Sequence, residues 1–364
     1  MVLNGVVRLI REELKIPLLE DIIKIPFNGY NVISTFSGGG GSSLGYRMAG
    51  FRVLWINEFM EKARETYKLN ASTNTIINGK DIRDLDYKDI LNEIKLDIGE
   101  IDILDGSPPC ASFSTQGKRD KDWGKIKSYS KTKQRTDDLF FEYIRLVNTL
   151  KPKVFVAENV SGLVKGRAKG YFLEILEAFK ECGYNVQVKL LKAHWLDVPQ
   201  MRERVFFIGV RDDLNIQPDF PKPKEVMTRI RDVLPLLNNK NLSDQEIYWI
   251  KDNTRMKKLW QYTKKGANFQ RAGLELYGKK GSYFGQVKVS PDKPCNTILT
   301  TPLYHWDLCR FLTIPEIKLF STFPEDFQLT GGFMDRFERI GRAVPPFMMK
   351  EIASVIRDKV LVNC

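Results

Sequence analysis

One cysteine of this chain follows a short apolar segment in a way that suits a nucleophile. The apolar run at residues 101–104 ends in Asp105, and Pro108 and Pro109 then precede Cys110. Proline fixes φ, so the pair holds the next residue at a defined angle. A free cysteine is more often a small buried hydrophobic residue, but this loop is too polar and too rigid for core filler. The pattern favours a presented thiol, with an inert buried thiol as the alternative.

A carboxylate follows another apolar run, at residues 154–157. Glu158 and Asn159 come directly after it. In an open parallel sheet, ligands bind beyond the carboxyl ends of the strands, so Glu158 could share a site with Cys110. The alternative is a glutamate that only hydrogen-bonds to the backbone.

Two arginines open a later apolar segment at residues 205–210. Gln200, Arg202 and Arg204 alternate along the chain, and alternate residues of an extended segment face the same side. Guanidinium groups suit a phosphate or an electron-rich ring oxygen. A solvated, charged start of a strand explains the same residues equally well.

A glycine-rich segment and two acidic residues point to a nucleoside cofactor. Residues 36–43 read Phe-Ser-Gly-Gly-Gly-Gly-Ser-Ser, and Glu58 follows about 20 residues after the glycines. Such a carboxylate meets a ribose hydroxyl pair, and Asp81 could accept from an adenine amino group. A plain tight turn with a surface glutamate, and a helix-capping aspartate, are the alternatives. The loop alone does not separate a dinucleotide from S-adenosylmethionine.

These residues follow an alternation of short apolar strands and longer helical segments. The alternation predicts an α/β fold with a mostly parallel sheet and helices on both faces. We expect strands at 30–36, 51–56, 101–104, 154–157, 186–191 and 204–210, and helices at 43–49, 59–69, 138–150, 171–179, 314–320 and 347–359.

The regular alternation ends after residue 211, where a proline-rich stretch at 218–223 reads as a linker. We therefore expect a second, smaller domain. The predicted division is an N-terminal extension (1–29), a catalytic and cofactor-binding domain (30–212), a smaller domain (213–305) and a C-terminal segment that returns to the catalytic domain (306–364).

Net charge, cysteine content and the lack of long apolar runs limit the classes of protein to which this chain can belong. The net charge is +12, which favours a polyanionic partner, although a merely soluble basic protein fits as well. The five cysteines are scattered without a C-x-x-C pair, and there are two histidines, so we expect neither disulfides nor a metal. No apolar run approaches the ~20 residues that span a bilayer, and residues 1–20 lack a signal-peptide pattern. We expect a cytoplasmic protein that does not contact a membrane.

Taken together, the motifs resemble the cytosine-C5 DNA methyltransferase family, in the order of its bacterial restriction-modification members. The resemblance covers residues 30–355, and residues 310–327 look like a further family motif. The five main matches, in order, are 36–41, the Pro108-Pro109-Cys110 loop with Phe113 and Ser114, 158–160, Gln200-x-Arg202-x-Arg204, and 341–346.

The resemblance implies covalent catalysis, since cytosine C5 is too weak a nucleophile to take a methyl group directly. Cys110, as thiolate, would attack C6, while Glu158 would hold or supply a proton at N3. C5 would then take the methyl group of S-adenosylmethionine, leaving S-adenosylhomocysteine. Loss of the C5 proton and of Cys110 would give 5-methylcytosine. Arg202 and Arg204 would orient the base, which must be flipped out of the duplex.

The resemblance also implies which residues bind. Glu58 would take the ribose hydroxyls and Ile82 the adenine face of S-adenosylmethionine, and no metal is implied. The implied cofactor-binding residues are Phe36, Ser37, Gly38, Gly40, Gly41, Glu58, Phe59, Asp81, Ile82, Asp105, Pro109, Leu139 and Ala343. The implied substrate-binding residues are Ser114, Gln116, Lys118, Asn159 and Gln200.

The implied overall fold is the Rossmann-like fold of S-adenosylmethionine-dependent methyltransferases, with a target-recognition domain at 213–305. The implied partner is double-stranded DNA, bound by a monomer in a prokaryotic or phage setting, with a cognate restriction endonuclease for the same site. A tRNA cytosine-5 methyltransferase of the same fold is an alternative, but its Cys-Phe-Thr tripeptide is absent. A catalytically silent DNA-binding homologue is another, although Cys110 and Glu158 are both present. Arg342 stands where the family has asparagine, which puts that local contact in doubt.

Overall fold

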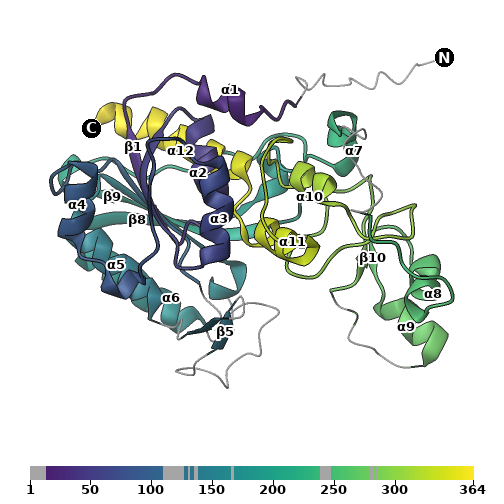
Figure 1. The fold of residues 1–364 in the computed structure, drawn as a ribbon. Coiled ribbons are helices and arrows are strands. Elements are labelled where there is room, and N and C mark those ends of the chain that lie inside the picture. Colours follow the sequence, from purple (N-terminus) through teal and green to yellow (C-terminus); the bar gives the residue numbers. More distant parts are fainter. Residues whose placement is uncertain are drawn as a thin grey trace, which may run out of the picture.

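The computed structural model describes residues 14–109, 127–129, 132–134, 138–164, 168–237, 247–278, 283 and 285–364. A sheet flanked by helices forms one side of the molecule, and a part with little sheet forms the other (Figure 1). The expected α/β class is confirmed.

The main sheet has seven strands in the order β3-β2-β1-β4-β7-β9-β8. Every neighbouring pair is parallel except those made by β9, which runs antiparallel to both β7 and β8. The strand bounds are β1 (Asn31–Thr35), β2 (Arg52–Asn57), β3 (Ile76–Asn78), β4 (Ile103–Gly106), β7 (Val154–Val160), β8 (Tyr184–Lys192) and β9 (Glu203–Arg211). One reversed strand among seven therefore makes the sheet mainly parallel, as expected.

The central strands are almost entirely buried because both faces of the sheet are covered. Successive side chains of a strand point to opposite faces, and Val32 of β1 belongs to one hydrophobic cluster while Ile33 belongs to the other. The second cluster takes in the helices α4 (Tyr87–Ile94), α5 (Leu139–Leu150) and α6 (Ala168–Glu181). The first takes in α2 (Gly41–Met48), α3 (Glu61–Asn70) and α12 (Pro346–Lys359).

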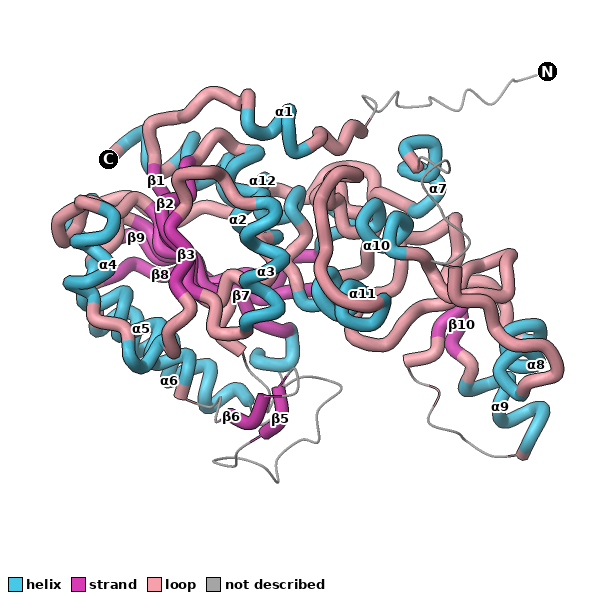
Figure 2. The backbone as a smooth tube through the Cα atoms, in the orientation of Figure 1, coloured by secondary structure: helices cyan, strands magenta, loops and turns pink. Residues whose placement is uncertain are grey.

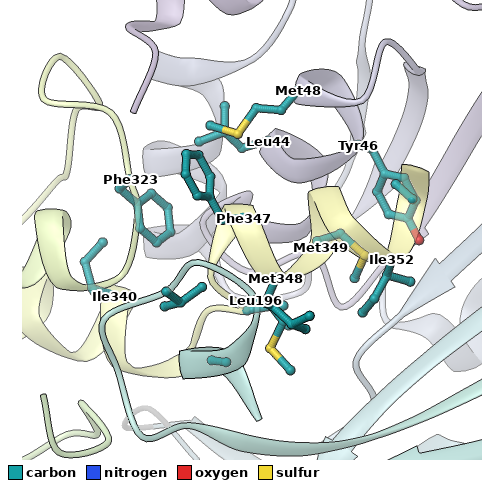
Figure 3. Packing of buried hydrophobic residues seen from close by; sticks show 14 of the residues in the cluster. Leu44, Tyr46, Met48, Leu196, Phe323, Ile340, Phe347, Met348, Met349 and Ile352 are labelled. Carbon is teal, nitrogen blue, oxygen red and sulfur yellow. The ribbon is translucent and has the colours of Figure 1, made fainter. Parts of the chain in front are cut away.

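The end of the chain packs against its beginning. Figure 3 shows Phe347, Met349 and Ile352 of α12 beside Leu44, Tyr46 and Met48 of α2. The two helices come close because α2 carries Gly45, where a Cβ would lie 2.5 Å from the Pro346 carbonyl oxygen. These contacts join α12 to α2, while the expected domain assignment of residues 306–364 stays a prediction.

The part away from the main sheet carries α8 (Arg255–Tyr262), α9 (Gln270–Tyr277) and β10 (Ala267–Asn268) (Figures 1 and 2). There, α8 and α9 pack on a small core of Leu259, Phe269, Ala272 and Tyr304. The domain division drawn from the sequence stays a prediction. The remaining elements are α1 (Leu19–Ile23), β5 (Lys127–Tyr129), β6 (Thr132–Gln134), α7 (Ile230–Val233), β11 (Val287–Lys288), α10 (Ile314–Phe320) and α11 (Phe333–Arg342).

Within the described ranges, no helix combines the length and apolar character needed to cross a membrane. The same residues contain no group of three or more His, Cys, Asp or Glu side chains arranged to hold a metal ion.

Candidate active site

A cavity of about 530 Å³ lies at the carboxyl ends of β1, β2, β4 and β7. Parallel sheets place ligand sites at this edge because each strand there turns into a loop. Fifteen of the residues singled out from the sequence line the cavity: Phe36, Ser37, Gly38, Gly41, Glu58, Phe59, Asp81, Ile82, Pro109, Leu139, Glu158, Asn159, Arg202, Arg204 and Ala343.

Other expected site residues do not line this cavity or cannot be placed. Gly40, Asp105 and Gln200 are buried outside its lining. Their binding roles stay predictions. Cys110, Ser114, Gln116 and Lys118 lie outside the described residues.

The glycine-rich loop brings backbone, rather than side chains, to the cavity. Gly40 caps α2 with φ of 99°, a left-handed conformation that suits glycine. Gly38 also has positive φ (56°), and a Cβ there would meet nothing within 4 Å, so a ligand can approach its backbone. Gly41 is required for a different reason, because a Cβ would lie 2.4 Å from the Val344 carbonyl oxygen. Phe36 holds φ of 52° without being glycine, a strain of about 1–2 kcal/mol.

Glu58 is held at the end of β2 by backbone donors. The Gly38 N–H donates to its Oε2 at 2.8 Å, and the Met60 N–H donates to its Oε1 at 2.7 Å. Burial raises the pKa of Glu58, while these amides and the charges of Arg339 and Arg64 oppose that effect. Each carboxylate oxygen can accept a second hydrogen bond, so Glu58 is fixed in place with acceptor capacity for a ligand hydroxyl.

Asp81, Ile82 and Leu139 also line the cavity. Asp81 also caps the 3₁₀ turn Ile82–Asp84, accepting from the Arg83 N–H at 3.0 Å. The capping alternative considered from the sequence is therefore observed, together with a place in the cavity lining. Ile82 is 3% exposed and offers an apolar surface.

Glu158 and Arg204 meet because β9 runs antiparallel to β7. The register pairs Val160 with Arg204, which brings the start of β9 to the carboxyl end of β7. The Arg204 Nε lies 2.8 Å from the Glu158 Oε1, and both side chains are 11% exposed. Burial lowers the pKa of Arg204, and the charge of Glu158 opposes this. The result is a nearly buried ion pair that faces the cavity.

Asn159 connects this ion pair to the proline loop. Its Nδ2 donates to the Pro108 carbonyl oxygen at 3.1 Å, and the bond is buried. Pro108 is two residues before Cys110 in the chain. Asn159 therefore fixes the end of β7 against the segment that carries the candidate nucleophile.

Arg202 joins the main sheet to the C-terminal segment. It is 2% exposed, and it donates to the carbonyl oxygens of Gly341 at 2.9 Å and Arg342 at 3.2 Å. Burial and the charge of Arg204 lower its pKa. Gly341 itself packs against residue 299, where a Cβ would lie 1.9 Å from the Leu299 carbonyl oxygen.

Arg342, which replaces the asparagine of the family pattern, keeps a defined position. It lines the cavity, and its Nε lies 2.8 Å from the Glu338 Oε1, one turn earlier in α11. Its backbone carbonyl still accepts from Arg202. The junction between the segments is thus made by main-chain contacts that do not depend on the side chain at residue 342.

Gln200 is buried but, unlike the two arginines, does not line the cavity. Its Nε2 donates to the Ser321 Oγ at 2.9 Å, and its Oε1 accepts from the Ile298 N–H at 3.3 Å. Sequence alternation predicted that all three side chains would project together, and the structure brings only Arg202 and Arg204 to the cavity. That prediction fails for Gln200, whose backbone forms an isolated bridge with Cys295 and whose side chain bonds to Ser321 instead.

Asp105 lies below the cavity floor. The Ser34 Oγ donates to it at 2.8 Å and the Tyr46 hydroxyl donates at 3.3 Å. Burial raises its pKa to about 7, which the two hydroxyl donors oppose. The observed contacts give Asp105 a part in joining β1, α2 and β4 beneath the site.

Sequence reasoning missed one charged residue of the lining. Arg339 of α11 faces Glu58 and passes over the glycine-rich loop, where a Cβ on Gly39 would lie 2.9 Å from the Arg339 Cδ. Burial lowers the pKa of Arg339. Its place two residues before Gly341 is the signal that could have found it.

The lining fits an adenosine cofactor by its chemistry. The volume is within the ~300–1,000 Å³ typical of small-molecule sites. The lining offers the open backbone of Gly38 and the carboxylate of Glu58, together with Asp81 and the apolar Ile82. Hydroxyl, amino and flat apolar groups of a nucleoside each find a complementary partner.

Comparison with known proteins agrees with the geometry. The family described as C-5 cytosine-specific DNA methylase matches residues 30–358. The Type II methyltransferase M.NgoFVII of Neisseria gonorrhoeae is 31% identical over 90% of this chain and 87% of its own length. M1.HphI of Haemophilus parahaemolyticus, also a Type II methyltransferase, is 30% identical over 89% of this chain and 86% of its own length.

Solved structures show the same fold. A chain described as a DNA modification methyltransferase encoded within an Escherichia coli prophage superposes with a TM-score of 0.68 and 23% identity, covering 91% of this chain and 99% of its own. A mutant of DNMT2 from Spodoptera frugiperda gives a TM-score of 0.62 at 16% identity, covering 90% and 99%. The expected Rossmann-like fold is confirmed.

Proposed function

This chain belongs to the C-5 cytosine-specific DNA methylases and is a cytosine DNA methyltransferase of restriction-modification type, and we propose that it uses S-adenosylmethionine and a transient bond between Cys110 and the cytosine ring. One observation carries the proposal. The Glu158–Arg204 ion pair faces the same cavity as Glu58 and Asp81, and Asn159 ties it to the Pro108 loop. A base and a nucleoside cofactor can therefore meet in one site.

The cofactor residues are proposed from their chemistry. Glu58 accepts from the ribose hydroxyls, Asp81 accepts from the adenine amino group and Ile82 packs on the adenine face. The Gly38 backbone and the neighbouring Ser37 border the remainder of the cavity. Bound S-adenosylmethionine would supply the transferable methyl group as a sulfonium.

The proposed chemistry divides among three residues. The Cys110 thiolate adds to C6, and the electron pair of the C5–C6 double bond moves toward N3, where Glu158 holds a proton. Arg204 keeps the Glu158 carboxyl in place through the 2.8 Å contact. After C5 is methylated, its proton passes to water and N3 returns its proton to Glu158. The C5–C6 double bond then re-forms as the cysteine departs as thiolate.

The substrate is DNA, and we propose that the target cytosine leaves the duplex to enter the cavity, because C6 and C5 are inaccessible to a nucleophile and a methyl donor within a base pair. The net charge of +12 supports backbone binding, and Arg255, Lys258, Lys264 and Lys265 are exposed on the part that carries α8. We propose further that the protein acts as a monomer in the cytoplasm, alongside an endonuclease specific for the same site.

The test combines methyl transfer with covalent trapping. Radiolabelled S-adenosylmethionine is offered with duplex DNA or with tRNA to the wild type, to Cys110→Ala and to the control Cys309→Ala. We expect label in DNA from the wild type and from Cys309→Ala, and none from Cys110→Ala. A duplex carrying 5-fluorocytosine at the methylated site should attach irreversibly to the wild type. The same duplex should not attach to Cys110→Ala. Transfer by Cys110→Ala, or label in tRNA and not in DNA, would refute the proposal.

A further inference from the structure

Arg83 connects the adenine end of the cavity to the start of α5. Its Nη1 donates to both oxygens of Asp81, at 3.1 and 2.9 Å. Its Nε and Nη2 donate to the two oxygens of Asp138 at 3.1 and 2.8 Å. One guanidinium thus lies between two carboxylates, and the hydrogen bond to Asp138 is the main reason that its pKa is raised.

These bonds leave one oxygen of the Asp81 carboxylate able to accept a further hydrogen bond. Its Oδ1 accepts from the Arg83 N–H at 3.0 Å and from Nη1, while its Oδ2 accepts from Nη1 alone. A carboxylate oxygen can take two hydrogen bonds. Among the described contacts, Oδ2 therefore retains an acceptor position, and Asp81 lines the cavity.

Among the described contacts, the guanidinium alone holds that oxygen in place. Without it, Asp81 would keep the single capping bond from the Arg83 N–H, and its carboxyl group could turn about χ2, a broad torsion in aspartate. The guanidinium is held in turn at Asp138, which precedes Leu139 of α5, itself part of the lining. The orientation of Asp81 is thus set by a helix and not by the turn alone.

A second arginine holds the same turn by other atoms. Arg145 of α5 donates to the carbonyl oxygens of Ile82 at 2.9 Å and Leu85 at 3.2 Å. It therefore supports the backbone of the wall without touching the Asp81 carboxylate in the described contacts. This separation supplies a matched control.

We propose that Arg83 is a positioning residue that aims the Asp81 Oδ2 at the exocyclic amino group of the cofactor's purine ring. Selectivity for a 6-aminopurine over a 6-oxopurine then depends on Arg83. The inference rests on the proposed use of S-adenosylmethionine. A 6-oxo group would place its acceptor oxygen against the Asp81 Oδ2, which is also an acceptor, so a fixed Oδ2 disfavours binding of the 6-oxopurine. A carboxylate that turns freely discriminates less between the two ligands.

The test measures binding by calorimetry, without turnover. S-adenosylhomocysteine and its 6-oxo analogue, S-inosylhomocysteine, are titrated into the wild type, Arg83→Gln, Arg83→Lys, Asp81→Asn and Arg145→Gln. We expect the wild type to favour the amino ligand by about 10-fold or more, since a hydrogen bond to a charged group is involved. Arg83→Gln should bring that ratio down several-fold toward the ratio of Asp81→Asn. Arg145→Gln should weaken both ligands alike and keep the ratio.

Several outcomes overturn the inference. If Arg83→Gln weakens both ligands by the same factor, Arg83 has only a structural part. Arg83→Lys covers the case in which Arg83→Gln does not fold, because lysine keeps the charge but cannot bond both carboxylates through a planar fork. An unchanged ratio of the two ligand affinities in a folded Arg83→Lys would also contradict the orientation of Asp81 by the guanidinium. If the wild type binds neither ligand, the proposed cofactor itself is wrong. If it binds both equally, the cofactor proposal stands and the part assigned to Arg83 falls.

Discussion

Replacing Gly341 with alanine increases helix propensity but introduces a steric clash. The structure shows which of the two effects on the free energy of unfolding is larger. Gly341 lies within α11, where alanine is favoured over glycine by about 1 kcal/mol. A Cβ there would lie 1.9 Å from the Leu299 carbonyl oxygen and 2.6 Å from its carbonyl carbon. Both are backbone atoms that no rotamer change can move. Overpacking of this kind costs about 1–3 kcal/mol, and more where the neighbour cannot yield.

Because the Leu299 backbone cannot yield, the upper end of that range applies, and we expect Gly341→Ala to lower the free energy of unfolding by about 2 kcal/mol after the propensity gain is subtracted. Gly170 supplies the control. It lies in α6, and a Cβ there would meet nothing within 4 Å. Gly170→Ala should raise the free energy of unfolding by up to about 1 kcal/mol, because only the propensity changes.

The assay is urea denaturation of each variant, followed by tryptophan fluorescence, with the KM for S-adenosylmethionine measured in parallel. Gly341→Ala should also raise this KM, because the Gly341 carbonyl that accepts from Arg202 sits at the cavity wall. Gly170→Ala should leave it unchanged. If Gly341→Ala is as stable as the wild type or more so, the close packing of α11 on residue 299 is wrong.

Three further results are expected. Asp105 has its pKa raised to about 7 from 3.8, so its contribution to stability is present below pH 3.8 and is lost as the pH rises to 7; Asp105→Asn should flatten the fall in unfolding free energy measured across that window. Asn159→Ala removes the bond to the Pro108 carbonyl and should lower kcat about 10-fold or more in single-turnover methylation, with a smaller change in cofactor KM. Gly41→Ala places a Cβ 2.4 Å from the Val344 carbonyl oxygen and should weaken S-adenosylhomocysteine binding in calorimetry, whereas unchanged affinity would contradict that contact.

Local patterns predicted the sheet well because the strands are buried on both faces. The run at 154–157 is the core of β7, which the structure extends to Val160, and the helix expected at 314–320 has the bounds of α10. α11 was missed although Phe333, Phe337 and Ile340 are buried at helical spacing. The three Arg and Glu residues at 336, 338 and 339 obscured that pattern, and Arg339 went unnoticed with it.

The direction of β9 was beyond the reach of sequence patterns. An apolar run reads the same whether its strand is parallel or antiparallel, and strand alternation also gives no warning that Gln200 precedes the strand. Gln200 instead makes an isolated bridge to Cys295, which turns its side chain toward Ser321. The prediction for Arg202 and Arg204 needed only that the segment be extended near Glu203.

That reversal of β9 is what allows the site to form. Were β9 parallel to β7 over the same residues, Arg204 would lie opposite Val154, four residues or about 13 Å from Glu158 along the strand. Because β9 runs antiparallel, Arg204 reaches Glu158, and Arg202 beside it reaches the carbonyl groups of Gly341 and Arg342. One reversed strand therefore brings Arg204 to Glu158 and Arg202 to the C-terminal wall, at the edge where the parallel strands end, so these contacts depend on strand direction as much as on residue type.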